Sequence, residues 1–404
     1  MSGRAMNDWW AREDLRFEGD ELFFAGRQVR DLAQQFGTPV FFYNGNRIIS
    51  NICRLQSSLG DVGFENRYTI KYAMKANRFA PLLTHLKGSG RVGIDACSPK
   101  EVVHAISCGF RPEEISFTAT SLSARDLAQL SRIKGLAMNC DSIRTIRQWG
   151  ELGSGRDIGI RINPSMGIGR AHNEKLHYSG AHTTKFGIYK EQFKEAVAVA
   201  RHYGLTVKRI HFHTGCGYLT PQLDKWNDII AACLWFVDEL DSVEIVNVGG
   251  GLGVPHTGRD EALDLTAWAR ILARHFISRP LSIEIEPGDY LVKDSGVLLL
   301  TVNMVEKKKD TVFVGVDAGF NIAVEPAVYG LPFHPVPAVR YEGESRKVTI
   351  VGNINEALDV WYADISLQPV SEGDCLALIN AGAYSSSMAS NHCMRGDFKE
   401  FLIV

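Results

Sequence analysis

Eight short apolar runs, each followed by a segment with helical spacing, constrain the fold of this chain more than any other feature. The runs lie at 68–74, 91–95, 115–118, 136–140, 158–162, 209–213, 244–248 and 282–286. Alternation of strand and helix eight times over about 220 residues is typical of a parallel (β/α)8 barrel. A doubly wound open sheet is the alternative, and the count of eight favours the barrel.

The pattern changes after about residue 290. Strand-like runs without long helices follow at 297–305, 311–316, 347–351 and 375–379, and similar runs occur near the N-terminus at 22–24 and 40–43. A chain of 404 residues is also too long for one ordinary core. We therefore predict an α/β protein with a (β/α)8 TIM-type barrel at 45–287. A mainly β barrel or sandwich domain would combine 1–44 with 288–404.

Charge and cysteine usage narrow the classes of function. Lys and Arg number 44 against 46 Asp and Glu, so no basic excess exists to hold nucleic acid or a membrane surface. The longest apolar stretches, such as 297–302, are far too short to span a membrane, and the N-terminus lacks the apolar core of a signal peptide. The eight cysteines show no metal-site spacing, so we expect reduced thiols in a cytoplasmic protein.

Polar residues cluster where the predicted strands end. These residues are Lys75, Asp95, Arg161, His213 and Glu286, together with the glycine-rich segment 249–253. Each alone has an ordinary structural explanation, because a strand-end Lys is usually solvated and a lone His is usually a hydrogen-bonded structural residue. The carboxyl ends of barrel strands form one face, however, so these side chains are expected to converge there.

The convergent residues match what pyridoxal 5'-phosphate needs. Lys75 supplies an amine for a Schiff base with the aldehyde, and a glycine-rich strand-to-helix turn at 249–253 supplies backbone N–H groups for the phosphate. Glu286 would keep the pyridine nitrogen protonated, and the His213 ring would lie against the ring face. This chemistry requires no metal.

Six segments carry a resemblance to a known family. They are Tyr-Ala-Met-Lys-Ala-Asn (72–77), His-Thr-Gly-Cys (213–216), Gly-Gly-Gly-Leu-Gly (249–253), Glu-Pro-Gly (286–288), Val-Asp-Ala-Gly-Phe-Asn (316–321) and Gly-Ala-Tyr (382–384). Arg161 and the stretch 185–187 also fit. Over nearly its whole length the chain resembles the fold-type III pyridoxal-phosphate decarboxylases, the family of diaminopimelate, ornithine and biosynthetic arginine decarboxylases.

The resemblance implies decarboxylation of a small-molecule amino-acid substrate by a head-to-tail homodimer, with each site completed by the partner's C-terminal domain. It also implies a set of cofactor-binding residues in which Cys216 replaces a phosphate-contacting Ser. That set is Lys75, Asp95, Arg161, His213, Cys216, Gly249, Gly250, Gly251, Gly253, Glu286, Gly288 and Tyr384.

Two departures from the family pattern concern the substrate. The diaminopimelate branch has Arg where this chain has Asp289, and Arg-Pro-x-x-Tyr where this chain has Glu325-Pro-Ala-Val-Tyr329. In that branch the two arginines grip the distal carboxylate, whereas two acids would repel it. We therefore expect a cationic or modified tail, as in ornithine, lysine, arginine or a derivative, with meso-diaminopimelate as the alternative. The expected substrate-binding residues are Asp289, Glu325, Tyr329, Glu356 and Asp359.

A third departure concerns protonation. The family usually has Cys-x-x-x-Asp where this chain has Asn355-Glu356-Ala-Leu-Asp359. Asn355 and Glu356 thus occupy catalytic positions, but an amide is no general acid near neutral pH. Another donor would be needed, and the candidates are Lys75, a water and Cys393. An amino-acid racemase and a non-catalytic regulatory relative are the remaining alternatives; the Glu286 carboxylate argues against the first, and the joint presence of Lys75, His213 and Glu286 against the second.

Overall fold

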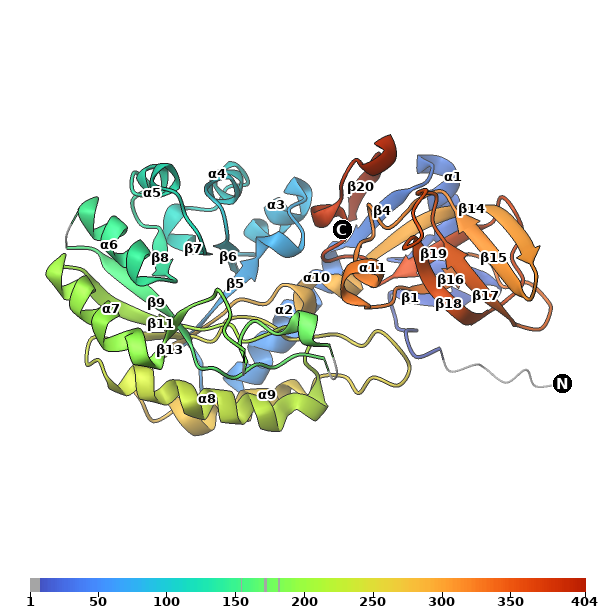
Figure 1. Ribbon diagram of the computed structural model, residues 1–404. Coiled ribbons are helices and arrows are strands. Elements are labelled where there is room, and N and C mark those ends of the chain that lie inside the picture. The colour runs from blue at the N-terminus through green and yellow to red at the C-terminus, as the bar shows by residue number, and fades with distance from the viewer. Residues whose placement is uncertain (1–7, 154, 171–172, 181) are drawn as a thin grey trace. The chain divides into compact units, whose positions relative to one another are not determined.

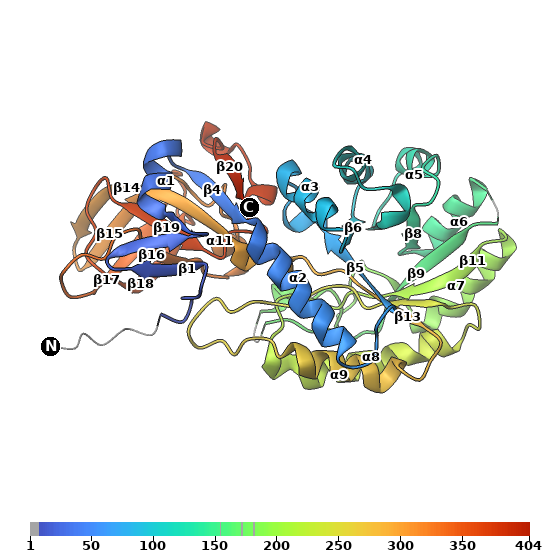
Figure 2. The same ribbon diagram turned by 180° about the vertical axis from the view of Figure 1, so that it is seen from behind.

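The computed structural model describes residues 8–153, 155–170, 173–180 and 182–404. The chain divides into two compact units (Figures 1 and 2). One, here called the barrel unit, contains Ile49–Val254 and Glu261–Leu291. The other, here called the β unit, contains Met1–Ile48, Pro255–Asp260 and Val292–Val404.

The barrel unit is built on eight parallel strands. They are β5 (Tyr68–Ala73), β6 (Gly93–Ala96), β7 (Ile115–Ala119), β8 (Ala137–Cys140), β9 (Asp157–Asn163), β11 (Thr206–His211), β12 (Ile245–Asn247) and β13 (Ser282–Ile285). Each strand pairs with the next, and β13 pairs in parallel with β5, which closes the sheet. The predicted (β/α)8 barrel is confirmed, and the open doubly wound sheet is excluded.

Helices follow most of the strands and pack around the barrel (Figure 1). They are α2 (Gly45–Gly60), α3 (Ala80–Ser89), α4 (Pro99–Ser107), α5 (Ala124–Leu130), α6 (Ile143–Glu151), α7 (Lys190–His202), α8 (Leu223–Asp238) and α9 (Leu265–Phe276), with the short α10 (Asp289–Val292). Local sequence determines several starts, because the side chains of Ser98, Ser123, Ser142 and Asp264 each accept a backbone N–H of the first helical turn.

The β unit is organised around the long strand β14 (Gly296–Lys308). Its first half pairs with β4 (Val40–Asn44) and β19 (Cys375–Ile379), and its second half pairs with β15 (Thr311–Val316). The sheet is extended by β16 (His334–Pro337), β17 (Arg346–Val351), β18 (Val360–Leu367) and β20 (Lys399–Ile403). The predicted mainly β domain is thus confirmed, and the N-terminal β4 belongs to its sheet.

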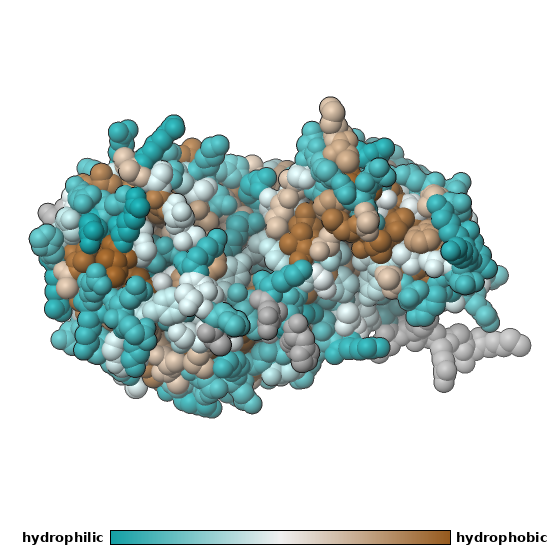
Figure 3. Space-filling model, viewed as in Figure 1, coloured by the Kyte–Doolittle hydropathy of each residue, from teal (hydrophilic) through white to brown (hydrophobic). Residues whose placement is uncertain are grey.

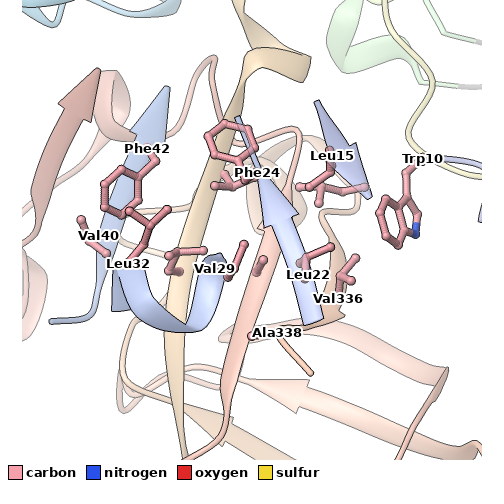
Figure 4. Packing of buried hydrophobic residues seen from close by; sticks show 14 residues of the cluster. Trp10, Leu15, Leu22, Phe24, Val29, Leu32, Val40, Phe42, Val336 and Ala338 are labelled. Atoms are coloured by element: carbon pink, nitrogen blue, oxygen red, sulfur yellow. The ribbon is translucent and has the colours of Figure 1, made fainter. Parts of the chain in front are cut away.

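A second, small sheet and one helix cover part of this unit. The sheet contains β1 (Leu15–Glu18), β2 (Glu21–Phe24) and β3 (Arg27–Gln28), and the helices of the unit are α1 (Val29–Phe36) and α11 (Glu325–Tyr329). Figure 4 shows Leu22 and Phe24 of β2 packed with Val29 and Leu32 of α1. The alternating burial of β2 leaves one face apolar, and this face forms the core.

The surface visible in Figure 3 is largely hydrophilic, interrupted by hydrophobic patches. Large apolar side chains with substantial exposure include Val103, Leu358 and Met394. Within the described part of the chain, no helix combines the length and the apolar character that a membrane crossing requires.

Candidate active site

Lys75 lies just beyond the first barrel strand. Strand β5 ends at Ala73, and Met74–Ala76 form one 3-10 turn that carries Lys75 onto the carboxyl-end face of the barrel. Ala73 N donates to Pro287 O at 3.1 Å, which ties this turn to the end of the last strand. Cys97 and Asp95 raise the pKa of Lys75, outweighing the opposite effect of burial.

The charged residues predicted at the strand ends converge in the barrel unit. The charges of Glu286, Lys75 and Arg161 shift the pKa of Asp95. The charges of Lys75 and Arg161 also shift the pKa of His213. Four strands and the turn after β5 therefore bring these five side chains within electrostatic range of one another. Such mutual perturbation of buried titratable groups is characteristic of functional sites.

Glu286 is held by three neighbours. His211 Nε2 lies 2.9 Å from Oε2, Asn247 Nδ2 donates to Oε1 at 2.6 Å, and Ser116 Oγ donates to Oε1 at 3.2 Å. Burial by itself would raise the pKa of Glu286, but His211, Asn247 and Lys75 lower it to about 2. Glu286 is therefore a buried carboxylate that stays ionised at neutral pH.

Asp95 behaves in the opposite way to Glu286. Burial and the nearby Glu286 charge raise the pKa of Asp95 well above its ordinary value. Two acids in one enclosed space disfavour each other's ionisation, so the Glu286 charge shifts Asp95 toward its protonated form. Asp95 Oδ1 is buried and has no hydrogen-bond partner among the described residues.

His213 lies two residues beyond β11, on a loop. Its ring centroid is 4.7 Å from that of Tyr178, at an interplanar angle of 52°. Burial, followed by the positive charges of Lys75 and Arg161, lowers the pKa of His213 well below its ordinary value. The ring is therefore neutral at pH 7, as suits a side chain that packs flat against a cationic heterocycle.

Arg161 is also inside the barrel unit, where it is 6% exposed. Its guanidinium carbon lies 4.6 Å from the centroid of the Phe186 ring. Burial lowers the pKa of Arg161, and Asp141 and Glu286 oppose that shift. Phe186 belongs to the stretch 185–187, so this part of the resemblance coincides with a contact to Arg161.

The glycine segment 249–253 follows β12, but no helix begins there. The next helix, α9, starts only at Leu265, so the expected strand-to-helix turn is wrong. The segment is an extended loop in which Gly249 and Gly251 have φ values of +68° and +99°. A Cβ on Gly251 would lie 2.3 Å from Gly215 O, so this loop packs closely on the segment after His213.

Cys216 lies in the segment that supports the glycine loop. Its backbone N donates to Leu176 O at 3.0 Å, and Tyr218 N donates to Gly251 O at 3.1 Å. The loop that follows β9 therefore packs on residues 214–216. Gly288 is buried and directly precedes α10.

The remaining predicted residues have the following surroundings. Asp289 is 8% exposed and begins α10. In the β unit, both carboxylate oxygens of Glu325 lie 2.6 Å from Lys293 Nζ, with Glu325 2% and Lys293 0% exposed. The negative charge of Glu325 is therefore balanced by the buried Lys293, which is four residues after Asp289 in the sequence. Tyr329 ends α11, and Tyr384 is half-buried with φ of +50°.

The segment 355–359 is an exposed turn of the β unit. Asp359, at its end, accepts from Phe320 N at 2.7 Å, Ile354 N at 2.7 Å and Trp361 Nε1 at 3.0 Å, so it organises the turn. Asn355 and Glu356 are exposed, and Glu356 Oε1 lies 3.2 Å from His392 Nε2. Cys393, the residue after His392, is exposed and has φ of +53°.

Four residues around the site were not anticipated. His211, Asn247 and Ser116 contact Glu286, and the charge of Cys97 acts on the pKa of Lys75. His211 and Asn247 each stand two positions before a predicted residue, His213 and Gly249. Because alternate residues of a strand share a face, this spacing was the available signal. Nothing in the local sequence marks Cys97, since it is brought near Lys75 only by the pairing of β5 with β6.

The arrangement fits pyridoxal phosphate. Asp95 Oδ1 and His213 Nδ1 are buried polar atoms with no hydrogen-bond partner among the described residues, so each could bind a polar group of the cofactor. Lys75, Glu286 and the 249–253 loop are the residues that would hold its aldehyde carbon, pyridine nitrogen and phosphate. No group of three or more His, Cys, Asp or Glu residues in the described parts of the chain could hold a metal ion.

Comparison with known proteins identifies the same type of site. Residues 46–293 match the family model described as the pyridoxal-dependent decarboxylase, pyridoxal binding domain. The chain is 34% identical to the diaminopimelate decarboxylase of Methanothermobacter thermautotrophicus, over 95% of this chain and 90% of that protein. It is 30% identical to the Escherichia coli K12 enzyme of the same name, over 92% and 90% respectively.

A solved structure confirms the architecture. The crystal structure of diaminopimelate decarboxylase from M. jannaschii in complex with L-lysine matches with a TM-score of 0.87 and 26% identity, covering 97% of this chain and 93% of that one. The similarity therefore extends through both the barrel unit and the β unit.

Proposed function

Because the chain belongs to the pyridoxal-dependent decarboxylase family, we propose that it removes the α-carboxylate of a diamino acid at the site around Lys75. The observation that carries the proposal is the pairing of a half-buried amine, Lys75, with a buried carboxylate of low pKa, Glu286, on one barrel face. Bound pyridoxal phosphate supplies an electron-accepting ring for the charge left on Cα when carbon dioxide departs.

The residues of the barrel unit divide the remaining tasks. Lys75 would hold the cofactor through its side-chain amine. Glu286 stays ionised, so it can hold a proton on the pyridine nitrogen throughout the reaction. The His213 ring, whose pKa is lowered so that it stays neutral, would pack against the cofactor ring and leave the opposite side to the substrate.

Meso-diaminopimelate is the first substrate we propose, because the relatives at 30% and 34% identity carry that activity in their names. The pairing of Glu325 with Lys293 supports this choice, since Glu325 is not available as an uncompensated anion to repel a distal carboxylate. Asp289 favours the second candidate, an amino acid with a cationic tail, because an acid at this position attracts an ammonium group.

We further propose a homodimer in which the 355–359 turn completes the partner's site, as the family resemblance implies. Asn355 cannot return the proton to Cα. Cys393 is supported as a donor because its neighbour His392 contacts Glu356 in the same turn. The eight free cysteines support a reducing, cytoplasmic location.

The test is an assay of carbon dioxide release by the purified protein with D and L forms of basic and dicarboxylic amino acids. Visible absorbance that is bleached by borohydride, and lost in Lys75→Ala, would establish the covalent cofactor link. Faster turnover of meso-diaminopimelate than of lysine, ornithine or arginine would support the first candidate, and the reverse order the second. A coloured protein that releases no carbon dioxide from any of them would overturn the proposal.

A further inference from the structure

Asn247 is a fully buried amide at the end of β12, and every polar atom of its side chain is engaged. Nδ2 donates to Glu284 Oε1 at 2.8 Å and to Glu286 Oε1 at 2.6 Å, while Oδ1 accepts from Gly249 N at 2.8 Å. An amide has two donor hydrogens on one side and an acceptor on the other, so this set of partners permits only one orientation of the group.

The strand register explains why these partners meet. His211 of β11 is the Cα partner of Asn247 of β12, which in turn is the partner of Glu284 of β13. Glu286 is two residues beyond Glu284, so it points to the same side of the strand. Asn247 and His211 therefore approach the Glu286 carboxylate from two neighbouring strands, one on each oxygen.

Three hydrogen bonds form a closed ring around this position. Glu286 N donates to Gly249 O at 2.7 Å, Gly249 N donates to Asn247 Oδ1, and Asn247 Nδ2 donates to Glu286 Oε1. The ring joins the carboxylate of Glu286 to the first residue of the glycine loop. Displacement of either one strains a bond to the other, so their separation is fixed.

The two carboxylates next to the Asn247 amide also require a hydrogen-bond donor between them. Glu284 and Glu286 are 3% and 6% exposed, and both direct Oε1 at the Asn247 amide. Arg209 Nε lies 3.3 Å from Glu284 Oε1 and balances that charge. Without the amide hydrogens, two buried carboxylates would face each other across a gap, which favours protonation of one of them.

We propose that Asn247 is a positioning residue that holds the Glu286 carboxylate ready for the pyridine nitrogen and locks the Gly249 loop that receives the phosphate. The inference rests on the proposed function, because it takes Glu286 as the partner of the pyridine nitrogen. It adds that the two ends of the cofactor are recognised by one coupled unit rather than by two independent contacts.

The experiment uses the full chain, freed of cofactor and reconstituted with pyridoxal phosphate labelled with 15N in the ring. In Asn247→Ala and in the isosteric Asn247→Asp, the Glu286 carboxylate loses its donor and becomes more basic. The ring proton therefore moves toward Glu286, and the 15N signal shifts toward that of unprotonated pyridine at a pH where the unsubstituted protein keeps the proton. Pyridoxal phosphate should bind Asn247→Ala roughly ten- to a hundredfold more weakly.

A second measurement addresses the coupling to the loop. Pyridoxal, which lacks the phosphate, should lose less affinity than pyridoxal phosphate in Asn247→Ala, because part of the loss arises from the released Gly249 loop. Equal losses for both ligands would refute the link to the phosphate end. Asn247→Asp keeps the size of the side chain, so the ring-nitrogen measurement does not depend on whether the Ala variant folds.

The matched control is Asn163→Ala. Asn163 is a buried amide at the end of β9 that bonds to Thr184, Phe186 and Ser179, with no carboxylate among these partners. The Asn163→Ala substitution should lower the free energy of unfolding and leave the position of the 15N signal of the cofactor ring unchanged. An unshifted signal in both Asn247 variants, or an equal shift in the control, would overturn the proposal. Failure of the unsubstituted protein to bind the cofactor would instead count against the proposed function.

Discussion

The site contains two acids whose pKa values are shifted in opposite directions. Asp95 and Glu286 are both buried, yet the pKa of one rises well above its ordinary value while that of the other falls to about 2. The difference follows from contacts, since Glu286 is approached by His211 and Asn247, and Asp95 Oδ1 has no hydrogen-bond partner among the described residues. Single hydrogen bonds therefore decide which carboxyl group can hold a charge.

Asn355 gives a prediction at the same scale. Asn355→Cys would restore a thiol in the exposed 355–359 turn, and a thiol can return a proton to Cα where an amide cannot. We expect a higher yield of amine per turnover, by about twofold or more. Fewer turnovers should end in pyridoxamine phosphate, so inactivation during the reaction slows. Product amine and released carbon dioxide are measured together.

The control for this variant is Asn353→Cys, which places a thiol two residues before Asn355, outside the 355–359 turn. It should leave both the yield and the inactivation rate unchanged. Cys393→Ser tests the donor proposed for the unsubstituted protein, and it should lower the amine yield. Unaltered yield and inactivation in Asn355→Cys would count against a protonation defect.

At the scale of elements, the conformation of the loop after β12 is maintained by close packing on the 213–217 segment, and no helix begins at this loop. Gly251 has φ of +99°, and an added Cβ would lie 2.3 Å from Gly215 O. Gly251→Ala therefore displaces the loop from the 213–217 segment. We expect affinity for pyridoxal phosphate to fall by about tenfold or more, as measured by titration of the cofactor-free protein.

Gly88 in α3 is the matched control for that substitution. A Cβ on Gly88 meets nothing within 4 Å, and the residue lies within a helix. Gly88→Ala should raise the free energy of unfolding by about 0.5–1 kcal/mol and leave cofactor affinity unchanged. If Gly251→Ala and Gly88→Ala bind pyridoxal phosphate with equal affinity, the prediction is wrong, because the loop then tolerates displacement without loss of cofactor binding.

The Lys293–Glu325 pair joins the segment before β14 to α11 within the β unit. Lys293→Met would remove the buried cation that lies 2.6 Å from the buried Glu325 carboxylate, so we expect the free energy of unfolding to fall by about 3–5 kcal/mol. Lys293→Met combined with Glu325→Leu should recover most of this loss, because both charges are then removed. Denaturant unfolding measures each variant.

The exposed pair Arg16–Glu18 of the same unit supplies the reference, and Arg16→Met should change stability by less than about 0.5 kcal/mol. The substrate KM of the double variant distinguishes two roles for Glu325. An unchanged KM fits a purely structural pair. A large change in KM would show that the pair also contacts the substrate.

At the scale of the whole molecule, half-buried histidines make stability depend on pH. Burial lowers the pKa of His334 to about 4, below the value of about 6.5 in the unfolded chain. Between these values the unfolded state binds a proton that the folded state does not. Stability is therefore lost as the pH falls from about 6.5 to 4, by up to about 1.4 kcal/mol per pH unit. The pKa of His213 is also lowered, so this residue likewise makes the barrel unit less stable as the pH falls.

Thermal unfolding between pH 4 and 7.5 tests this dependence with His334→Gln. The melting temperature of the β unit in the variant should fall less steeply on acidification, by several degrees over this interval. The amide cannot take up a proton, so its contribution stays constant. Parallel curves for the two proteins would show that His334 does not control the acid response.

Local sequence was sufficient to identify the barrel strands and the residues with distinctive chemistry. Apolar runs that end in polar residues predicted all eight strands, and Lys75, His213 and Glu286 were recognised from their motifs. Hydrophobic periodicity and strand direction depend on neighbours along the chain, so they can be read from it. The same local signal misplaced a helix after the glycine segment, because Gly-rich loops resemble one another before their packing is known.

Tertiary structure alone decided which groups meet and what charge they hold. The register of β11, β12 and β13 brings His211, Asn247 and Glu286 together, and the β5–β6 pairing brings Cys97 toward Lys75. Likewise, Glu325 is an acid in the sequence but one half of a buried ion pair in the folded β unit. Burial and contact across strands determine pKa and net charge, and both arise from residues far apart in sequence.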